Sequence, residues 1–136
     1  MVYRTYFKSG NKYGAIKTEF NGKKYDSKFE AGIAQELDLR LKAHDIKAVD
    51  AQYKVEIPIY RKDGSIASYV RHKVDFRVTN NDGSYTLLEA KGVDTTDYKW
   101  RRKLLEEIWL PEHPDYDYEV VYQNRNKYYK NNNLHK

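Results

Sequence analysis

The chain contains no cysteine, few prolines and glycines, and no long apolar run. The lack of cysteine excludes disulfide bonds and thiolate zinc sites. No segment approaches the roughly 18 uninterrupted apolar residues of a membrane-spanning helix, so we expect no membrane association. The segment 1–10 lacks the apolar core of a secretory signal peptide. Together these absences predict a cytoplasmic protein.

Charge is abundant and unevenly distributed. Residues 1–29 carry net +5 from seven basic and two acidic side chains, and residues 124–136 carry +4 from four basic side chains. The segment 30–123 is net −4, from 14 basic and 18 acidic side chains. The length predicts a single domain, 1–136, with a basic arm at about 1–24 and a polar basic tail at about 124–136. Basic ends of the chain are suited to binding a polyanionic partner. The alternative is that they only aid solubility.

Hydrophobic periodicity and turn residues predict two helices and four strands. The helices are expected at 27–45 and at about 97–110, the second being stopped by prolines. The strands are expected at 52–60, 68–78, 84–91 and 116–123. Asp-Gly pairs mark two hairpin turns between the first three strands. The order αβββαβ predicts an α/β fold with a mixed central sheet flanked by helices.

Glu30 stands out because it falls among apolar residues on the first predicted helix. At ~100° per residue it lies within the stripe formed by Phe29, Ile33 and Leu37. Ser27 and Glu30 also fit a capping box, in which the glutamate reaches back to the Ser27 backbone amide. The carboxylate is therefore either a helix cap or a group that a site on the sheet needs.

Charged residues interrupt the second and third predicted strands. Alternation places Asp75 and Lys73 on one face of the second strand, and Glu89 and Lys91 on one face of the third. If the two strands pair as a hairpin, Asp75 can lie near Glu89 and Lys91. Two nearby carboxylates repel unless a proton or cation lies between them. The alternative is a salt bridge between Asp75 and Lys91, with Glu89 in solvent.

The opposite face of the second strand is apolar apart from one histidine. It carries Val70, His72, Val74, Phe76 and Val78. We therefore expect His72 to be a core residue and not a ligand.

Asp75 is followed, after thirteen intervening residues, by Glu89-Ala90-Lys91. Together with Glu30, this set combines several hard oxygen donors with one lysine. Carboxylates suit Mg²⁺ or Mn²⁺, which keep open positions for phosphate oxygens. Such an ion activates water and neutralises charge on phosphate, and a lysine can orient the water or stabilise the developing charge. The set therefore predicts phosphodiester hydrolysis.

In this order of elements, the pattern Asp75…Glu89-x-Lys91 resembles the PD-(D/E)xK nuclease superfamily. A closer likeness, over about 12–129, is to the phage endonuclease I family of junction-resolving enzymes. It is carried by the segments KYGAIKTEFNGKKYDSKFEA, VDFRV, LLEAKG and LPEHPDYDYEVVYQNRNKYYK. Val74 stands where the superfamily motif has proline, a departure that touches no ligand.

The resemblance implies a restriction-endonuclease-like core and assigns roles to the site residues. Asp75 and Glu89, with the Ala90 carbonyl, would hold Mg²⁺ or Mn²⁺, and Glu30 would hold a second metal or its water shell. Lys91 would assist the nucleophile.

The resemblance further implies a metal-dependent DNA endonuclease that resolves Holliday junctions and leaves 5′-phosphate and 3′-hydroxyl ends. Two symmetric nicks imply a homodimer, in which strand 52–60 could take part. If the gene belongs to a phage, the protein would work in the infected bacterial host during DNA recombination. The alternatives are a nonspecific or sequence-specific nicking enzyme and a noncatalytic DNA-binding accessory protein with this fold.

Basic residues outside this set are candidates for contacts with DNA phosphates. They are Lys12, Lys17, Lys73, Lys99, Arg102 and Lys103. Any one such residue is more often just a solvated surface residue. Trp100, Leu104 and Ile108 recur at helical spacing, which predicts packing on the sheet and not a stacking platform for bases.

Overall fold

The computed structural model describes residues 18–20, 23–25, 28–123 and 128–131. Its chain divides into two compact units, Met1–Asp45 and Ile46–Lys136. Among the described residues, no helix is long and apolar enough to cross a membrane.

The first unit contains a short hairpin and one helix. β1 (Thr18–Phe20) pairs antiparallel with β2 (Lys23–Tyr25), and α1 spans Lys28–Lys42. Glu30 is 6% exposed and belongs to the buried side of α1 with Ile33 and Ala34. The predicted position of Glu30 within the apolar stripe is thus confirmed, while its predicted cap partner, Ser27, lies outside the described residues.

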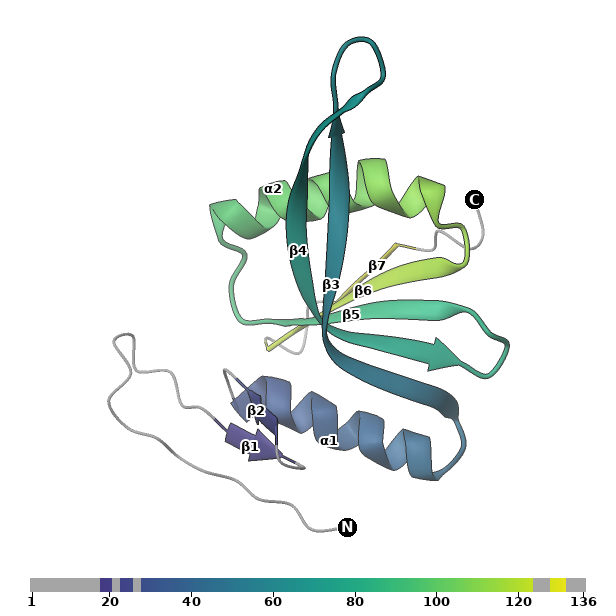
Figure 1. The fold of residues 1–136 in the computed structure, drawn as a ribbon. Coiled ribbons are helices and arrows are strands. Elements are labelled where there is room, and N and C mark those ends of the chain that lie inside the picture. Colours follow the sequence, from purple (N-terminus) through teal and green to yellow (C-terminus); the bar gives the residue numbers. More distant parts are fainter. Residues whose placement is uncertain (1–17, 21–22, 26–27, 124–127, 132–136) are drawn as a thin grey trace. The chain divides into compact units, whose positions relative to one another are not determined.

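The second unit is built on a five-stranded mixed sheet, with strand order β3-β4-β5-β6-β7. Its elements are β3 (Ile46–Tyr60), β4 (Ile66–Asn80), β5 (Tyr85–Lys91), α2 (Thr96–Leu104), β6 (Tyr116–Tyr122) and β7 (Tyr128–Asn131) (Figure 1). β5 and β6 run parallel, and the other neighbouring strands are antiparallel. The predicted α/β class and mixed sheet are confirmed.

Both predicted Asp-Gly turns form, and both use the same chemistry. Gly64 and Gly83 have φ values of 89° and 88°, in the left-handed region that glycine adopts without steric penalty. The aspartate before each glycine, Asp63 or Asp82, accepts hydrogen bonds from the backbone amide and hydroxyl of the following serine. These turns fix the β3–β4 and β4–β5 connections.

The bounds of several elements differ from the sequence prediction. β3 begins at Ile46, before its predicted start at residue 52, and α1 ends at Lys42, before its predicted end at residue 45. β7 lies within the predicted polar tail and pairs with β6, so this part of the tail is a strand of the main sheet. α2 is followed directly by a π-helical turn, Leu105–Trp109, and a 3₁₀ turn, Leu110–Glu112.

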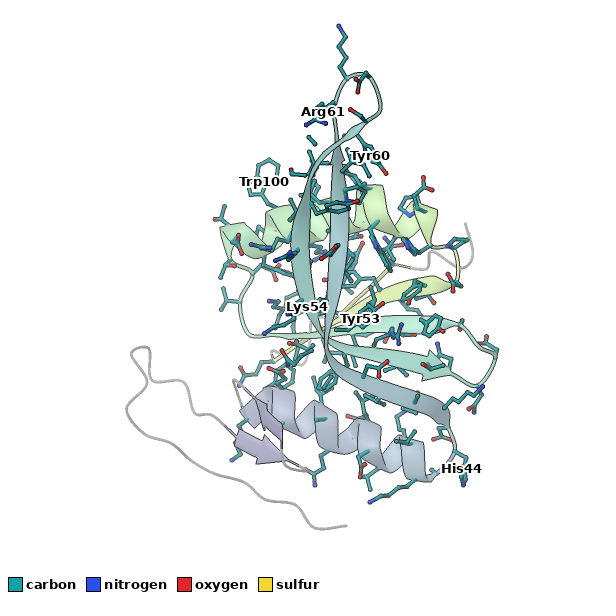
Figure 2. The ribbon with its side chains drawn as sticks, viewed as in Figure 1. His44, Tyr53, Lys54, Tyr60, Arg61 and Trp100 are labelled. Atoms are coloured by element: carbon teal, nitrogen blue, oxygen red, sulfur yellow. The ribbon has the colours of Figure 1, made fainter. Side chains whose placement is uncertain are left out.

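The core of the second unit combines one face of the sheet with the helical segment that follows β5. Its buried members are Val55, Ile57, Val74, Leu87, Leu105, Trp109, Leu110, Tyr116, Tyr118, Val120 and Tyr122. Leu104 and Ile108 pack against this core as predicted. Trp100 does not: it is 62% exposed and projects from α2 (Figure 2). The buried face follows Tyr98 and Trp109 instead, so the predicted phase of this helix was wrong for Trp100.

β4 separates from β5 halfway along its length, and we call this point the fork. The β4–β5 ladder ends at the pair Phe76–Leu88, while β5 continues beside β6 through Lys91. Gln52, on β3, has a φ of 57°, and the pair Gln52–Asp75 is missing from the middle of the β3–β4 ladder. The ladder is also irregular near its two ends, between Ile46 and Ala48 and between Ile59 and Tyr60. Beyond the fork, β3 and β4 form a two-stranded ribbon that leaves the rest of the sheet and passes α2 (Figure 1).

The fork also interrupts the alternation of side chains along β4. Val74 belongs to the core with Leu87. Arg77, three residues further on, donates a hydrogen bond of 3.2 Å to the hydroxyl of Tyr116, another core residue. The predicted alternation of burial along β4 is confirmed, since His72, Val74, Phe76 and Val78 are all buried. Strict alternation would also place Val74 and Arg77 on opposite faces, whereas both contact the same core, so the single predicted face does not continue through the fork. The change falls where Gln52 is left-handed and the Gln52–Asp75 pair is missing from the ladder.

Candidate functional site

Asp75 lies at the fork and takes part in the contact between the separating strands. Its Oδ2 accepts a hydrogen bond of 2.8 Å from the backbone amide of Ala90. In an uninterrupted antiparallel ladder such an amide bonds to a backbone carbonyl of the neighbouring strand. The Asp75 side chain takes this role, and it therefore lies beside the residue between Glu89 and Lys91.

Glu89 is buried in a chain of hydrogen-bonded side chains. It is 2% exposed, and its Oε1 lies 2.7 Å from Nε2 of His72. Its Oε2 accepts a hydrogen bond from the hydroxyl of Tyr118, which lies 2.7 Å from the hydroxyl of Tyr98. Burial, reinforced by the charge of Glu89, raises the pKa of both tyrosines. Both hydroxyls therefore stay protonated. The alternative that placed Glu89 in solvent is wrong.

Lys91 is half-buried and points to the same side of β5 as Glu89. Its Nζ lies 4.1 Å from the centre of the Tyr98 ring, a cation–π contact. The ion pairs of the described residues do not include the alternative salt bridge between Lys91 and Asp75.

A pocket of about 360 Å³ opens beside Glu89 and Lys91. We call it the fork pocket. Four further basic residues line it: Lys54, Arg71, Lys73 and Arg101. Asp75 does not line this pocket. It lies at the fork, where its side chain contacts the backbone amide of Ala90. The structure thus brings Asp75, Glu89 and Lys91 to one region of the second unit, with Lys73 at its border.

The predicted basic residues of α2 lie in a different hollow. Lys99, Arg102 and Lys103 line a groove of about 680 Å³ with residues of β7, and we call it the α2–β7 groove. Nε of Arg102 lies 2.7 Å from Oε1 of Glu106, and its guanidinium stacks 3.7 Å from the ring centre of Tyr129. Arg102 therefore ties β7 to the helix, whereas Lys99 and Lys103 are exposed.

Three predicted site residues belong to the first unit of the chain. Lys12 and Lys17 lie outside the described residues. Glu30 lies in the first unit, so its part in the site stays a prediction.

The donor set at the fork suits a hard divalent cation. Among the described residues, no group of three or more His, Cys, Asp or Glu side chains is arranged to hold a metal ion. Mg²⁺ does not require such a group, because proteins commonly bind it through one or two carboxylates, with waters and substrate phosphates completing its shell. Asp75 and Glu89 are two carboxylates of the kind that such an ion needs.

His72 is the site residue that sequence reasoning missed. It is 3% exposed, as expected of a core residue, but it contacts Glu89. Its Nδ1 is buried and has no hydrogen-bond partner among the described residues. Strict alternation had placed it on the face opposite Asp75. Only the break at the fork brings the two residues into one region, and the sequence carries no clear signal for that break.

The chain was compared with known proteins. A family model described as "Protein of unknown function (DUF1064)" matches residues 10–121. No curated protein matches the chain. A solved structure described as "Crystal structure of SSO0001" is similar over 72% of this chain and 48% of that chain, with 12% identity and a TM-score of 0.40. This chain spans about half the length of that protein, and the likeness is too distant to indicate a function. Because the family model covers most of its length, the chain belongs to the DUF1064 family.

Proposed function

We propose that the protein is a metal-dependent DNA endonuclease that hydrolyses phosphodiester bonds at the fork. The observation that carries the proposal is the meeting of Asp75, Glu89 and Lys91 at the point where β4 leaves β5. A carboxylate as buried as Glu89 is costly unless it is hydrogen-bonded or has a function. Here it lies at the wall of an open, basic pocket, where a phosphate can approach it.

Asp75, Glu89 and the Ala90 carbonyl would hold Mg²⁺ or Mn²⁺, and Glu30 would add a carboxylate from the first unit. The bound ion would supply a more acidic water and neutralise charge on the phosphate. The chain's own groups keep the ligands in place: the Ala90 amide holds Asp75, and His72 and Tyr118 hold Glu89.

Lys91 has two possible roles in the reaction. It orients the water that attacks the scissile phosphate in line, or it stabilises the negative charge that develops there. The products are a 5′-phosphate and a 3′-hydroxyl. Its ammonium contacts the Tyr98 ring, and it lines the same pocket as Glu89.

The finer proposal is a Holliday-junction resolvase with a restriction-endonuclease-like core. It is supported by the αβββαβ order, the motif spacing and the likeness of the sequence segments to phage endonuclease I. A junction differs from duplex in the arrangement of its phosphates, so a basic dimer can select it through backbone contacts. Lys73, Lys99 and Lys103 are the exposed described candidates for such contacts.

One observation favours a second candidate, a DNA-binding protein that does not cleave. Both oxygens of Glu89 already accept hydrogen bonds from core residues, His72 and Tyr118. A purely structural carboxylate would show the same bonds.

The test is cleavage of four-way, three-way and linear DNAs of matched length and sequence in Mg²⁺, with EDTA as the control. We expect paired nicks on opposing strands near the branch of the four-way junction, from a protein that elutes as a dimer. Equal cleavage of linear duplex, or a strict monomer, would replace the resolvase with a general nicking nuclease. Binding without cleavage in either Mg²⁺ or Mn²⁺ would leave the noncatalytic alternative.

Glu30 needs a separate test because it lies in the first unit. Glu30→Gln keeps the hydrogen bond of a capping box, since glutamine also serves there. We expect this variant to lose cleavage while its melting temperature stays close to that of the unaltered protein. Near-normal turnover at the usual Mg²⁺ concentration would identify Glu30 as a helix cap only.

A further inference from the structure

Two lysines lie directly opposite each other on the ribbon formed by β3 and β4 beyond the fork. Lys54, which is labelled in Figure 2, pairs with Lys73 in the β3–β4 register, and both side chains are exposed. Residues opposite each other on adjacent strands share a face, and like charges in this arrangement destabilise the sheet. Among the described residues, no acidic side chain forms an ion pair with either lysine.

The next pair on the same face shows that this ribbon can balance its charges. Glu56 lies opposite Arg71, and Nε of Arg71 is 3.4 Å from Oε1 of Glu56. The pair is two residues along each strand from Lys54 and Lys73. An acidic residue at position 54 or 73 would have formed the same kind of cross-strand ion pair. The two lysines instead form a like-charged pair, which an anion from outside the chain would stabilise.

The other basic residues of the fork pocket already have partners. Arg101 pairs with Asp97 at 2.9 Å and donates a hydrogen bond to the backbone carbonyl of Arg71. Lys91 lies over the Tyr98 ring. Lys54 and Lys73 are therefore the lysines of the pocket lining that have neither an ion-pair partner nor an aromatic partner among the described residues.

We infer that Lys54 and Lys73 form a subsite for a backbone phosphate of DNA, flanking the phosphate that is cleaved beside Glu89 and Lys91. The inference rests on the proposed function for the identity of the ligand. Lysine is a strongly hydrated point charge with three donors, which suits a phosphate approached from solvent. The same pocket wall carries Glu89 and Lys91, so a strand held by the two lysines passes the proposed reaction centre.

The experiment measures DNA binding in EDTA, where no cleavage interferes. Lys54→Gln, Lys73→Gln and the double variant are titrated with four-way and linear DNA over a range of salt concentrations. Each lost phosphate contact lowers the slope of log K against log salt by about 0.9, which corresponds to about eightfold weaker binding at 0.1 M salt. We expect this for each single variant and about twice the change in slope for the double variant. Melting temperatures should stay level or rise, because a repulsion is removed.

Lys47→Gln is the matched control, since it removes the same charge from an exposed position on β3 outside the fork pocket. Normal binding by both single variants, or an equal loss in Lys47→Gln, would overturn the subsite. A second arm titrates the DNA complex with inorganic phosphate at constant ionic strength. Displacement at low phosphate would show a free-anion site and overturn the DNA assignment. Absence of cleavage by the unaltered protein in Mg²⁺ would refute the nuclease proposal separately, because the subsite is read from binding alone.

Discussion

The two basic regions of the second unit differ in how their charges are balanced. In the α2–β7 groove, Glu106 accepts hydrogen bonds from Arg102, Tyr129 and Asn131, and Arg102 stacks on Tyr129. In the fork pocket, Lys54 and Lys73 face each other without an acidic partner among the described residues. A basic residue is therefore a good candidate for phosphate binding only when the fold leaves its charge unbalanced.

The larger of the two hollows is not the one that contains the predicted catalytic residues. The α2–β7 groove is the larger hollow, about 680 Å³ against about 360 Å³ for the fork pocket. The larger hollow contains no predicted catalytic residue, whereas Glu89 and Lys91 line the smaller one. We propose the fork pocket as the place of the reaction because two of the predicted catalytic residues, Glu89 and Lys91, line it.

The largest expected difference between the two regions is in catalysis. Asp75→Asn removes a charged ligand without changing the size of the side chain, and Lys91→Ala removes the ammonium beside Glu89. Groups that activate or position a nucleophile contribute typically about 10²–10⁴-fold to rate. We expect single-turnover cleavage of the four-way junction to fall by at least about 10²-fold in each variant.

The matched control for Lys91→Ala is Lys130→Ala, which removes an exposed lysine from the α2–β7 groove. Its cleavage rate at saturating protein should stay within about twofold, because a surface substitution leaves the reaction centre intact. Circular dichroism and DNA binding in EDTA confirm that the variants fold. If folded Asp75→Asn cleaves like the unaltered protein, the metal assignment is wrong.

A smaller effect is expected from His72, which positions Glu89. Partners that hold a metal ligand in place typically contribute about 10–100-fold to affinity or activity. His72→Phe keeps a ring in the core but removes the bond to Glu89, so the Mg²⁺ concentration for half-maximal cleavage should rise by about tenfold or more. His72→Gln can again donate to the carboxylate and should restore part of the loss.

The Mg²⁺ requirement of His72→Phe distinguishes a role in positioning Glu89 from a purely structural role. A merely structural role would lower the melting temperature of His72→Phe and leave its Mg²⁺ requirement unchanged, which would refute the positioning role. His113→Gln is the control, because His113 is a partly buried histidine that contacts the backbone of Trp109, away from the fork.

Much of this fold follows from local sequence, and the fork is where local reasoning failed. The Asp-Gly turns, the order of strands and the inward position of Glu30 depend on a few neighbouring residues, and all three were predictable. The left-handed Gln52 and the end of the β4–β5 ladder are set by long-range packing. They changed the faces along β4 and brought His72 to Glu89. Trp100 was misplaced for a similar reason, since two phases of its helix are both apolar and the sheet selects the one with Tyr98 and Trp109.

A third prediction concerns the contribution of the α2–β7 groove to stability. Arg102→Ala leaves Glu106 in a half-buried position without its cationic partner, and a hydrogen bond to a charged group is worth about 1.5–3 kcal/mol. We expect the free energy of unfolding in urea to fall by about that amount, with DNA affinity close to normal. Lys99→Ala, an exposed neighbour, should change stability by no more than about 0.5 kcal/mol. The opposite pattern, normal stability and weak DNA binding, would make Arg102 the phosphate contact that the sequence predicted.

The smallest expected effect is at Thr95, the N-cap of α2, which borders the fork pocket. Its Oγ1 accepts a hydrogen bond of 3.2 Å from the backbone amide of Tyr98. Loss of such a cap costs about 1 kcal/mol, so Thr95→Ala should lower the free energy of unfolding by about that amount, while Thr95→Ser should not. Thr96→Ala is the control, and it should leave stability within about 0.5 kcal/mol. Cleavage at saturating Mg²⁺ should change little in all three variants, because the cap begins a helix whose Tyr98 is also held by Tyr118. A cleavage defect in Thr95→Ala at normal stability would instead make the Thr95 hydroxyl part of the reaction centre and extend the functional region of the fork pocket to the start of α2.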